Sequence, residues 1–419
     1  MRIMKYLFIH QTIPGQFYQL AKALAEDKNN KVYFVSRAGA ENIPGVEAFR
    51  YQFSGKRGPT HPHLQNLQNG TLAGEAVAAV LLQLEYERKL RPDLIYAHPG
   101  WGESLFVKEL YPDVPLVHYA EFYYHTLGAD SFSTVDEVPE FADFMRLRMK
   151  NAVNLLSLET CDRAVTPTEW QWRQQPPRYR PKISVIHDGI DTDAVRPDPA
   201  TVLYLPDGAE LRQGDAVVTY VNRHLEPFRG MFVFAEAAAI VAKKWPACRF
   251  LVVGSESGQY YGPHPPKGRT YREMAIERLG AARDLFYFMG KLAYADFLRV
   301  LQVSAAHVYL TRPFVLSWSM LEAMSAGCLV IGAATPPVAE VIHDDENGLL
   351  VDPYSPAELA ERIDEALTDW ARMAELRRAA RQTILDKYAL GICLAAQHRL
   401  IADTLAESAA TQFGVPRLA

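Results

Sequence analysis

Residues 307–332 read HVYLTRPFVLSWSMLEAMSAGCLVIG, and this stretch contains one complete strand–helix–strand unit. The apolar run 307–310 predicts a buried strand, a loop follows, and a helix is expected from about Ser319. Gly327 supplies the helix C-cap, and the second apolar run 329–332 predicts another buried strand. Buried strands joined by helices are typical of parallel sheets that are covered on both faces.

The same alternation of short apolar runs and helix-length segments recurs in both halves of the chain. It predicts a parallel α/β sheet in each half. In the first half we expect strands at residues 6–10, 32–35, 94–97, 115–119, 164–166 and 183–186. In the second half we expect strands at residues 216–221, 249–253, 285–289, 307–310, 329–332 and 349–351.

The length of 419 residues favours two domains, because single domains usually contain about 100–200 residues. Residues 188–215 contain three prolines and no sustained periodicity, which indicates a connection between domains. We therefore expect one Rossmann-like domain at 1–195 and a second at 210–389, with a last helix at about 390–419 packing back on the first. Doubly wound sheets bind ligands at the carboxyl ends of their strands, so two facing sheets predict a site in the cleft between them.

The composition is that of a soluble globular protein, with 49% hydrophobic and 22% charged residues. A net charge of -5 makes nucleic acid an unexpected partner. The four cysteines have no metal-type spacing and read as buried thiols in a reducing compartment. With no apolar window long enough to span a bilayer, we expect a cytoplasmic protein. Peripheral membrane contact stays open, because the segment 144–150 could lie on anionic lipid or be an amphipathic cover.

The start of the helix after residue 316 is the strongest candidate site. Backbone amides near Ser317 and Trp318 would face an anion at the positive end of the helix dipole, where phosphate binds readily. Glu322, in the first turns, could hold ribose hydroxyls, or it could simply stabilise the helix N-terminus.

A second candidate follows the first strand of the second half. Arg223 and Arg229 emerge where such sheets bind ligands, and a guanidinium offers paired donors to phosphate oxygens. Gly230 would allow close approach of the backbone at the next helix start. Both arginines could equally be surface charges.

Further candidates in the first half are His98, at the end of the strand 94–97, His118, inside the strand 115–119, and a polar and aromatic cluster that follows. His98 and His118 would point toward the cleft on the acceptor side, although a lone histidine in such a place is often a packing residue. The cluster 121–125, Glu-Phe-Tyr-Tyr-His, could stack on a sugar or form part of an interdomain core.

Taken together, the order and spacing of these segments resemble the retaining GT-B glycosyltransferases of family 4, also called group 1, over nearly the whole chain. The segments that carry the resemblance are 185–192 (VIHDGIDT), 222–230 (NRHLEPFRG), 288–292 (FMGKL), 321–327 (LEAMSAG), 337–342 (PVAEVI) and 346–349 (ENGL). The resemblance implies a GT-B architecture with nucleotide on the second domain and acceptor on the first.

The resemblance also implies roles for individual residues. Arg223 and Arg229 match the basic pair that neutralises the donor diphosphate, and Glu322 matches the carboxylate that holds the ribose. Lys291 and Leu292 match the stretch that receives the base. Gly15, in the loop after the first strand, matches the family's glycine-containing loop that approaches phosphate or acceptor.

The chain departs from the family pattern at two positions. Phe314 stands where the family usually has a glutamate in contact with the transferred sugar, eight residues before Glu322. Glu121 stands where the family tends to have a histidine. It could replace the missing contact to the donor sugar or bind acceptor hydroxyls.

We therefore expect a metal-independent transferase that moves a sugar from a nucleotide diphosphate to a hydroxyl acceptor with retention and needs no cofactor. The departing phosphate can accept the acceptor's proton, while Arg223 and Arg229 stabilise the developing charge. The alternatives are a non-catalytic sugar-nucleotide-binding protein, an epimerase, or a phosphorylase, for which the sequence has no evident pyridoxal site.

Overall fold

The computed structural model of the protein describes residues 3–39, 42–53, 61–132, 137–256 and 261–412. Contacts divide the chain into two compact units. The first contains residues 1–189 and 391–419, and the second contains residues 190–390. Each unit is built around its own parallel sheet.

The first unit has a seven-stranded sheet in the order β3-β2-β1-β4-β5-β6-β7, and every neighbouring pair is parallel. Its strands are β1 (Met4–Ile9), β2 (Asn30–Ser36), β3 (Val46–Arg50), β4 (Leu94–Ala97), β5 (Leu116–Tyr119), β6 (Arg163–Thr166) and β7 (Ile183–Val185). Only β3 lies outside the ranges expected from the sequence. It is an edge strand without a fully buried residue, so it lacks the apolar run that marks the others.

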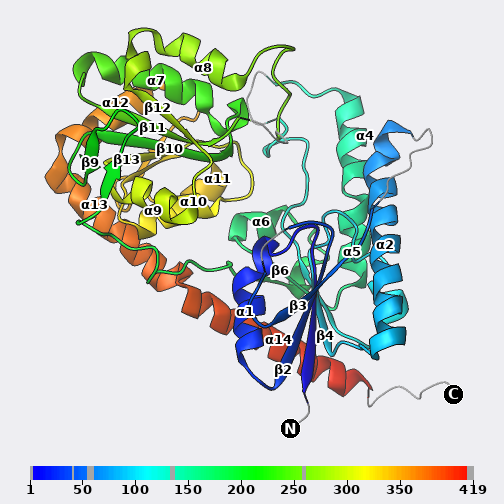
Figure 1. Cartoon of the computed structure of the whole chain (residues 1–419). Coiled ribbons are helices and arrows are strands. Elements are labelled where there is room, and N and C mark those ends of the chain that lie inside the picture. The colour runs from blue at the N-terminus through cyan, green and yellow to red at the C-terminus, as the bar shows by residue number, and fades with distance from the viewer. Residues whose placement is uncertain (1–2, 40–41, 54–60, 133–136, 257–260, 413–419) are drawn as a thin grey trace. The chain divides into compact units, whose positions relative to one another are not determined.

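Helices cover both faces of the first sheet. They are α1 (Tyr18–Glu26), α2 (Gln65–Arg88), α3 (Val107–Leu110), α4 (Phe141–Lys150), α5 (Ala152–Thr160), α6 (Glu169–Gln174) and α14 (Leu390–Gln412). One core contains buried residues of α2 and α5, and the opposite core contains residues of α1 together with Leu400 and Ile401 of α14. Within this unit, α14 lies on the same face of the sheet as α1 (Figure 1), and Gln397 accepts a hydrogen bond from Tyr96 at 2.8 Å. The C-terminal helix is therefore part of the first unit.

The second unit has a six-stranded parallel sheet in the order β12-β11-β10-β13-β14-β15. Its strands are β10 (Val217–His224), β11 (Arg249–Ser255), β12 (Phe286–Gly290), β13 (Ala306–Tyr309), β14 (Val330–Ala333) and β15 (Leu349–Val351). Its helices are α7 (Met231–Lys244), α8 (Tyr271–Leu279), α9 (Tyr294–Gln302), α10 (Trp318–Ser325), α11 (Pro336–Ala339), α12 (Pro356–Thr368) and α13 (Trp370–Thr383). All six strands coincide with expected ones to within a few residues.

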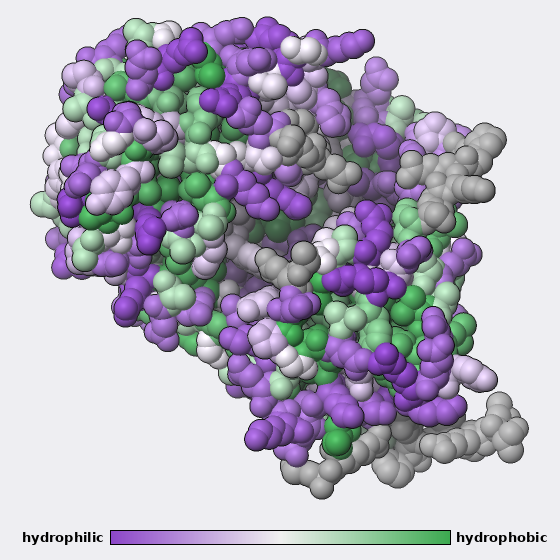
Figure 2. Space-filling view, viewed as in Figure 1, coloured by the Kyte–Doolittle hydropathy of each residue, from purple (hydrophilic) through white to green (hydrophobic). Residues whose placement is uncertain are grey.

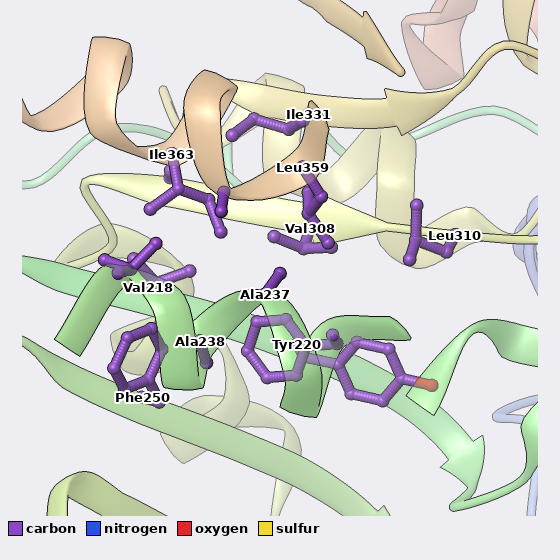
Figure 3. Close-up of a cluster of buried hydrophobic side chains, with 14 of the residues drawn as sticks. Val218, Tyr220, Ala237, Ala238, Phe250, Val308, Leu310, Ile331, Leu359 and Ile363 are labelled. Atoms are coloured by element: carbon purple, nitrogen blue, oxygen red, sulfur yellow. The ribbon is translucent and has the colours of Figure 1, made fainter. Parts of the chain in front are cut away.

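The core on one face of the second sheet shows why this sequence forms these layers. Figure 3 shows Val218, Tyr220 and Val308 of the strands packed against Ala237 of α7 and Leu359 of α12. Alanines on α7 let its backbone approach the sheet, and larger side chains from α12 fill the remaining space. The opposite face is covered by buried residues of α9, α10 and α13.

From residue 190 on, the expected interdomain connection at 188–215 is part of the second unit. It contains an antiparallel hairpin of β8 (Val202–Tyr204) and β9 (Glu210–Arg212), and Leu203, Leu205 and Leu211 are buried in that unit's core. The boundary consequently falls after residue 189, not at 195. The prolines interrupt the periodicity without preventing burial, which is why the hairpin was not predicted.

Figure 2 shows hydrophilic and hydrophobic residues interspersed over the visible face. None of the helices in the described part of the chain combines the length and apolarity needed to cross a bilayer. On α4, Leu147 is buried, whereas Phe141, Phe144 and Met145 are exposed.

Candidate functional site

The turn from β10 to α7 places Arg229 at the carboxyl end of the second sheet. A short 3-10 turn, Pro227–Arg229, ends at Gly230, which has a φ of 73°. A Cβ built on Gly230 would lie 2.4 Å from the Cβ of Leu310. Glycine is therefore required at this turn both for its left-handed conformation and for the close approach of the next segment.

Arg229 is held in one orientation by groups from three segments. Its Nη1 donates a 2.7 Å hydrogen bond to Thr311 Oγ1, and its carbonyl accepts one from the Tyr220 hydroxyl at 2.8 Å. The guanidinium also lies 5.4 Å from the ring centroid of Tyr261 and 5.6 Å from that of Phe314. These contacts leave donors of the guanidinium for a ligand while fixing its direction.

Glu226 is a member of this cluster that the sequence reasoning missed. Its side chain is 2% exposed, and its carboxylate accepts the N–H groups of Tyr261 at 2.8 Å and Gly262 at 3.4 Å. These bonds hold the segment that carries Tyr261 against Phe314, whose ring centroid is 5.1 Å away. A glutamate 35 residues before its partners gives no local signal of this role.

The start of α10 is less open to an anion than the sequence suggests. Ser317 is the N-cap, but its N–H donates to the hydroxyl of Tyr309 at 2.9 Å. The N–H of Ser319 donates to Ser317 Oγ at 3.3 Å, and that of Met320 to the Ser317 carbonyl at 3.3 Å. The prediction that the Ser317 N–H is free to bind phosphate is therefore wrong in this structure, because this N–H already donates a hydrogen bond to Tyr309. Trp318, the first residue of α10, is 42% exposed.

Glu322 lies on α10 and is joined to the segment after β12. Its Oε1 accepts a 2.7 Å hydrogen bond from the hydroxyl of Tyr294, the first residue of α9. Burial raises the pKa of Glu322, and the bond from Tyr294 opposes this rise. Lys291, three residues before Tyr294, is exposed, and Leu292 packs against the core. Glu322 and the stretch predicted to receive the base are thus brought together through Tyr294, which the sequence reasoning did not single out.

Arg223 is not part of the Arg229 cluster. It is the next-to-last residue of β10, its side chain is exposed, and it forms no hydrogen bond or ion pair with the described residues.

In the first unit, Glu121 is the centre of a polar network. Gln16 Nε2 donates to its Oε1 at 2.7 Å, and His98 Nε2 lies 3.3 Å from its Oε2. Burial alone raises the pKa of Glu121, but the hydrogen bond from His98, the neighbouring imidazoles of His98 and His10, and the hydrogen bond from Gln16 together hold this pKa below its ordinary value. The carboxyl group is therefore ionised at neutral pH.

Backbone donors determine the tautomers of the two histidines in this network. The N–H of Gly100 donates to Nδ1 of His98 at 3.2 Å, and that of Thr12 donates to Nδ1 of His10 at 2.9 Å. Both Nδ1 atoms are acceptors, so the protons are on Nε2. His98 then donates to Glu121, and His10 donates to Gln16 Oε1 at 2.8 Å. Burial lowers the pKa of His10 to about 3, which keeps it neutral.

Gly15 forms the turn that brings Gln16 to Glu121. Its φ is 54°, and a Cβ built on it would lie 2.5 Å from the ring of His10. In this structure Gly15 therefore makes room for His10.

His118 does not join the network. Its side chain is fully buried, its Nδ1 lies 3.1 Å from the carbonyl of Ser157, and burial lowers its pKa to about 3. It lies in the middle of β5 on the core side, so the expectation that it faces an acceptor is wrong. The packing alternative describes it correctly.

A pocket opens beside Glu121, at the carboxyl ends of β4 and β5. It is lined by residues of 98–101, 119–122 and 154–158, together with Tyr124 and Gln175. The ring of Trp101 stacks on His98 with centroids 4.4 Å apart, and Trp101 is 39% exposed. Within the described part of the chain, no group of three or more His, Cys, Asp or Glu side chains is placed to hold a metal ion.

Two doubly wound sheets with ligand-type side chains at their carboxyl ends define a two-domain α/β protein of the kind that binds nucleotides. The family profiles identify it further. The glycosyl transferase family 4 group matches residues 28–195, and the glycosyl transferases group 1 match residues 206–383. The chain belongs to this family of glycosyltransferases and has the GT-B fold.

Relatives agree with the family assignment, and solved structures agree with the fold. D-inositol 3-phosphate glycosyltransferase of Corynebacterium aurimucosum is 27% identical over 307 residues, which are 69% of this chain and 66% of the relative. Sucrose-phosphate synthase from Thermosynechococcus elongatus superposes with a TM-score of 0.68 and 19% identity, covering 96% of this chain and all of the other. Anabaena HepE in complex with UDP gives a TM-score of 0.65 and 17% identity, covering 97% and 100%. The match with the first relative thus covers about two thirds of that relative's length. The two solved structures have the same fold as this chain.

Proposed function

We propose that the protein transfers a sugar from a nucleoside diphosphate donor to a hydroxyl group of an acceptor, with retention of anomeric configuration. The observation that carries this proposal is the oriented guanidinium of Arg229 at the carboxyl end of the second sheet, in the segment that the group 1 profile matches. A fixed cation in this place suits a diphosphate, whose charge increases as it leaves.

The other residues of the second unit take the remaining parts of the donor. Glu322 accepts hydrogen bonds from ribose hydroxyls, and Tyr294 orients its carboxylate. Lys291 and Leu292 border the base, and Trp318 lies beside the phosphates at the start of α10. Arg223, which is exposed, contributes mainly long-range attraction.

Phe314 makes this donor site less acidic than one with a carboxylate at the same position. Its ring packs on Tyr261 and beside Arg229, so no acidic side chain from this position competes for the guanidinium. The side chain at the position that the resemblance assigns to the transferred sugar is therefore apolar.

The reaction needs no metal ion or cofactor in this proposal. Arg229 stabilises the departing diphosphate, which accepts the proton of the acceptor hydroxyl on the same face of the sugar as the new bond forms. No group here is required to act as a covalent nucleophile. A location in the cytoplasm and contact with a membrane surface stay predictions.

A turnover assay tests the proposal. The purified chain is incubated with UDP-, GDP-, ADP- and dTDP-sugars and a panel of hydroxyl acceptors, with and without a chelator, and released diphosphate and product anomers are measured. We expect one donor base to support transfer with retention in the chelator. An inverted product, or activity lost with the chelator, would contradict the corresponding part of the proposal.

The variant Glu322→Gln sharpens this assay. It keeps the acceptor atom for Tyr294 but removes the charge offered to the ribose, so the donor KM should rise about tenfold. Glu361→Gln, an exposed position on α12 of the same unit, is the matched control. Equal donor KM values for the two variants would remove Glu322 from the site.

A further inference from the structure

The pocket beside Glu121 contains an ionised carboxylate that still has room for ligand hydrogen bonds. Each carboxylate oxygen has two lone-pair directions, and the network provides one donor to each: Gln16 to Oε1 and His98 to Oε2. The side chain of Glu121 remains 25% exposed. Two or more hydroxyl groups of a ligand can therefore donate to it.

The wall of the same pocket provides a flat apolar surface. Trp101 is fixed by its stack on His98 and by an edge contact with His10 at 5.3 Å between ring centroids. Its partial exposure leaves indole surface for a ligand. Aromatic faces suit the apolar side of a sugar or cyclitol ring, while the carboxylate suits its hydroxyl edge.

The charge of the pocket selects against phosphorylated ligands. Among the described residues that line it, none is a lysine or an arginine, and Glu121 carries a negative charge. Lys150 is not among these lining residues; its ammonium lies 3.5 Å from the ring centroid of Tyr124, which is one of them. Burial lowers the pKa of Lys150, and the charge of Asp130 opposes this effect. A phosphate group beside Glu121 would be repelled and would find no guanidinium among the described residues that line the pocket.

We infer that this pocket is the acceptor site and that it takes a neutral, polyhydroxylated ring, with vicinal hydroxyls on Glu121 and the ring face on Trp101. This inference rests on the proposed glycosyl transfer and specifies its acceptor class. It separates the chain from the relative named for an inositol 3-phosphate acceptor.

Gln16 is a positioning residue for Glu121. His10 donates to the amide oxygen of Gln16, so the amide nitrogen must face Glu121. The direction of the carboxylate thus depends on a side chain 105 residues earlier in the sequence. Gln16→Met keeps the length of the side chain and removes both hydrogen bonds.

Saturation-transfer NMR on the full chain, with and without UDP, tests the inference directly. The probes are methyl α-glucoside and myo-inositol as neutral rings, and glucose 6-phosphate and inositol 3-phosphate as charged ones. We expect transfer to at least one neutral ring and none to its phosphate, and Glu121→Gln should weaken the neutral ligand about tenfold or more. Binding of the phosphates alone, or equal binding by Glu121→Gln, would overturn the inference.

Matched variants separate binding from folding. Glu85→Gln, on the exposed side of α2, and Trp370→Ala, a comparably exposed tryptophan of the second unit, should bind the ring as the wild type does, whereas Trp101→Ala should not. Gln16→Met should raise the acceptor KM about tenfold and leave the donor KM unchanged. An unchanged acceptor KM in Gln16→Met would remove its positioning role.

Titration with nucleoside diphosphates on the same samples separates this inference from the proposed function. If a diphosphate binds and no neutral ring does, the acceptor assignment fails alone. If the neutral ring binds and no diphosphate does, the proposed transfer fails and the pocket is a sugar-binding site without a donor.

Discussion

The two units use the same kind of scaffold to hold opposite charges. In the first, the anion Glu121 is fixed by an amide and an imidazole, whereas in the second the cation Arg229 is fixed by a hydroxyl and two aromatic rings. Both lie near the carboxyl ends of parallel strands. The architecture determines where a ligand binds, and the side chains there determine its charge.

The comparison extends to the backbone. Each unit has a glycine with positive φ between its first long strand and the following helix, Gly15 in one and Gly230 in the other. In both, a Cβ would collide with a neighbour at 2.5 or 2.4 Å. The neighbours differ, since His10 belongs to the polar network and Leu310 to the core.

The largest effect is expected from removing the cation of the second unit. Arg229→Ala should weaken nucleoside diphosphate binding by about 2–3 kcal/mol, or roughly 30- to 150-fold, because a charge-assisted contact is lost. Isothermal titration calorimetry measures this. Arg299→Ala, an exposed arginine of α9 in the same unit, should bind as the wild type does.

The glycine comparison gives the next effect. Gly230→Ala should destabilise the protein by about 2–4 kcal/mol, since strain from the positive φ adds to the collision with the Leu310 Cβ. Gly208 also has a positive φ, but the space around it is open. Gly208→Ala should therefore lower the free energy of unfolding by only about 1 kcal/mol. Urea denaturation compares them, and equal losses would show that the collision is relieved without cost.

A smaller effect is expected on the pH dependence of stability, from two buried histidines, one in each unit. Burial lowers the pKa of His118 to about 3 and that of His307 to about 4, below the ordinary value of 6.5. Because the folded pKa is the lower one, stability is complete above about pH 6.5 and is lost as the pH falls toward 4.

The expected slope for each histidine approaches about 1.4 kcal/mol per pH unit within that window. His118→Asn and His307→Asn should each flatten the pH dependence of the urea midpoint, and the exposed His398→Asn on α14 should not. A slope unchanged in both buried variants would mean that other groups control the acid transition.

The smallest effect, on nucleoside diphosphate binding, is expected from replacing Arg223. Because this side chain is exposed and is not oriented by the described residues, Arg223→Ala should weaken diphosphate binding by less than about 1 kcal/mol, and salt should abolish the difference. A loss as large as that of Arg229→Ala in calorimetry would place Arg223 in direct contact with phosphate.

Most of the fold could be predicted because buried parallel strands are continuous apolar runs. The exceptions are β3, an exposed edge strand, and the hairpin of β8 and β9, whose surroundings contain prolines and turns. In neither case does the local sequence show that tertiary contacts complete the element.

The candidate site could be predicted only where function leaves a local motif. Arg229 and Glu322 stand in such motifs, but Tyr294 meets Glu322 across 28 residues and Gln16 meets Glu121 across 105. The Ser317 amide was misjudged because Tyr309, at the end of the preceding strand, accepts its hydrogen bond. Partners that the fold brings together from distant segments have no periodicity or spacing to reveal them.

The central claim is that donor and acceptor depend on separate charged groups, Arg229 and Glu121. Calorimetric titration of UDP, GDP, ADP and dTDP into the wild type, Arg229→Ala and Glu121→Gln tests it most directly. The account predicts that one diphosphate binds, that Arg229→Ala loses it by roughly 30-fold or more, and that Glu121→Gln retains it. Equal loss in both variants, or no diphosphate binding to the folded wild type, would contradict it.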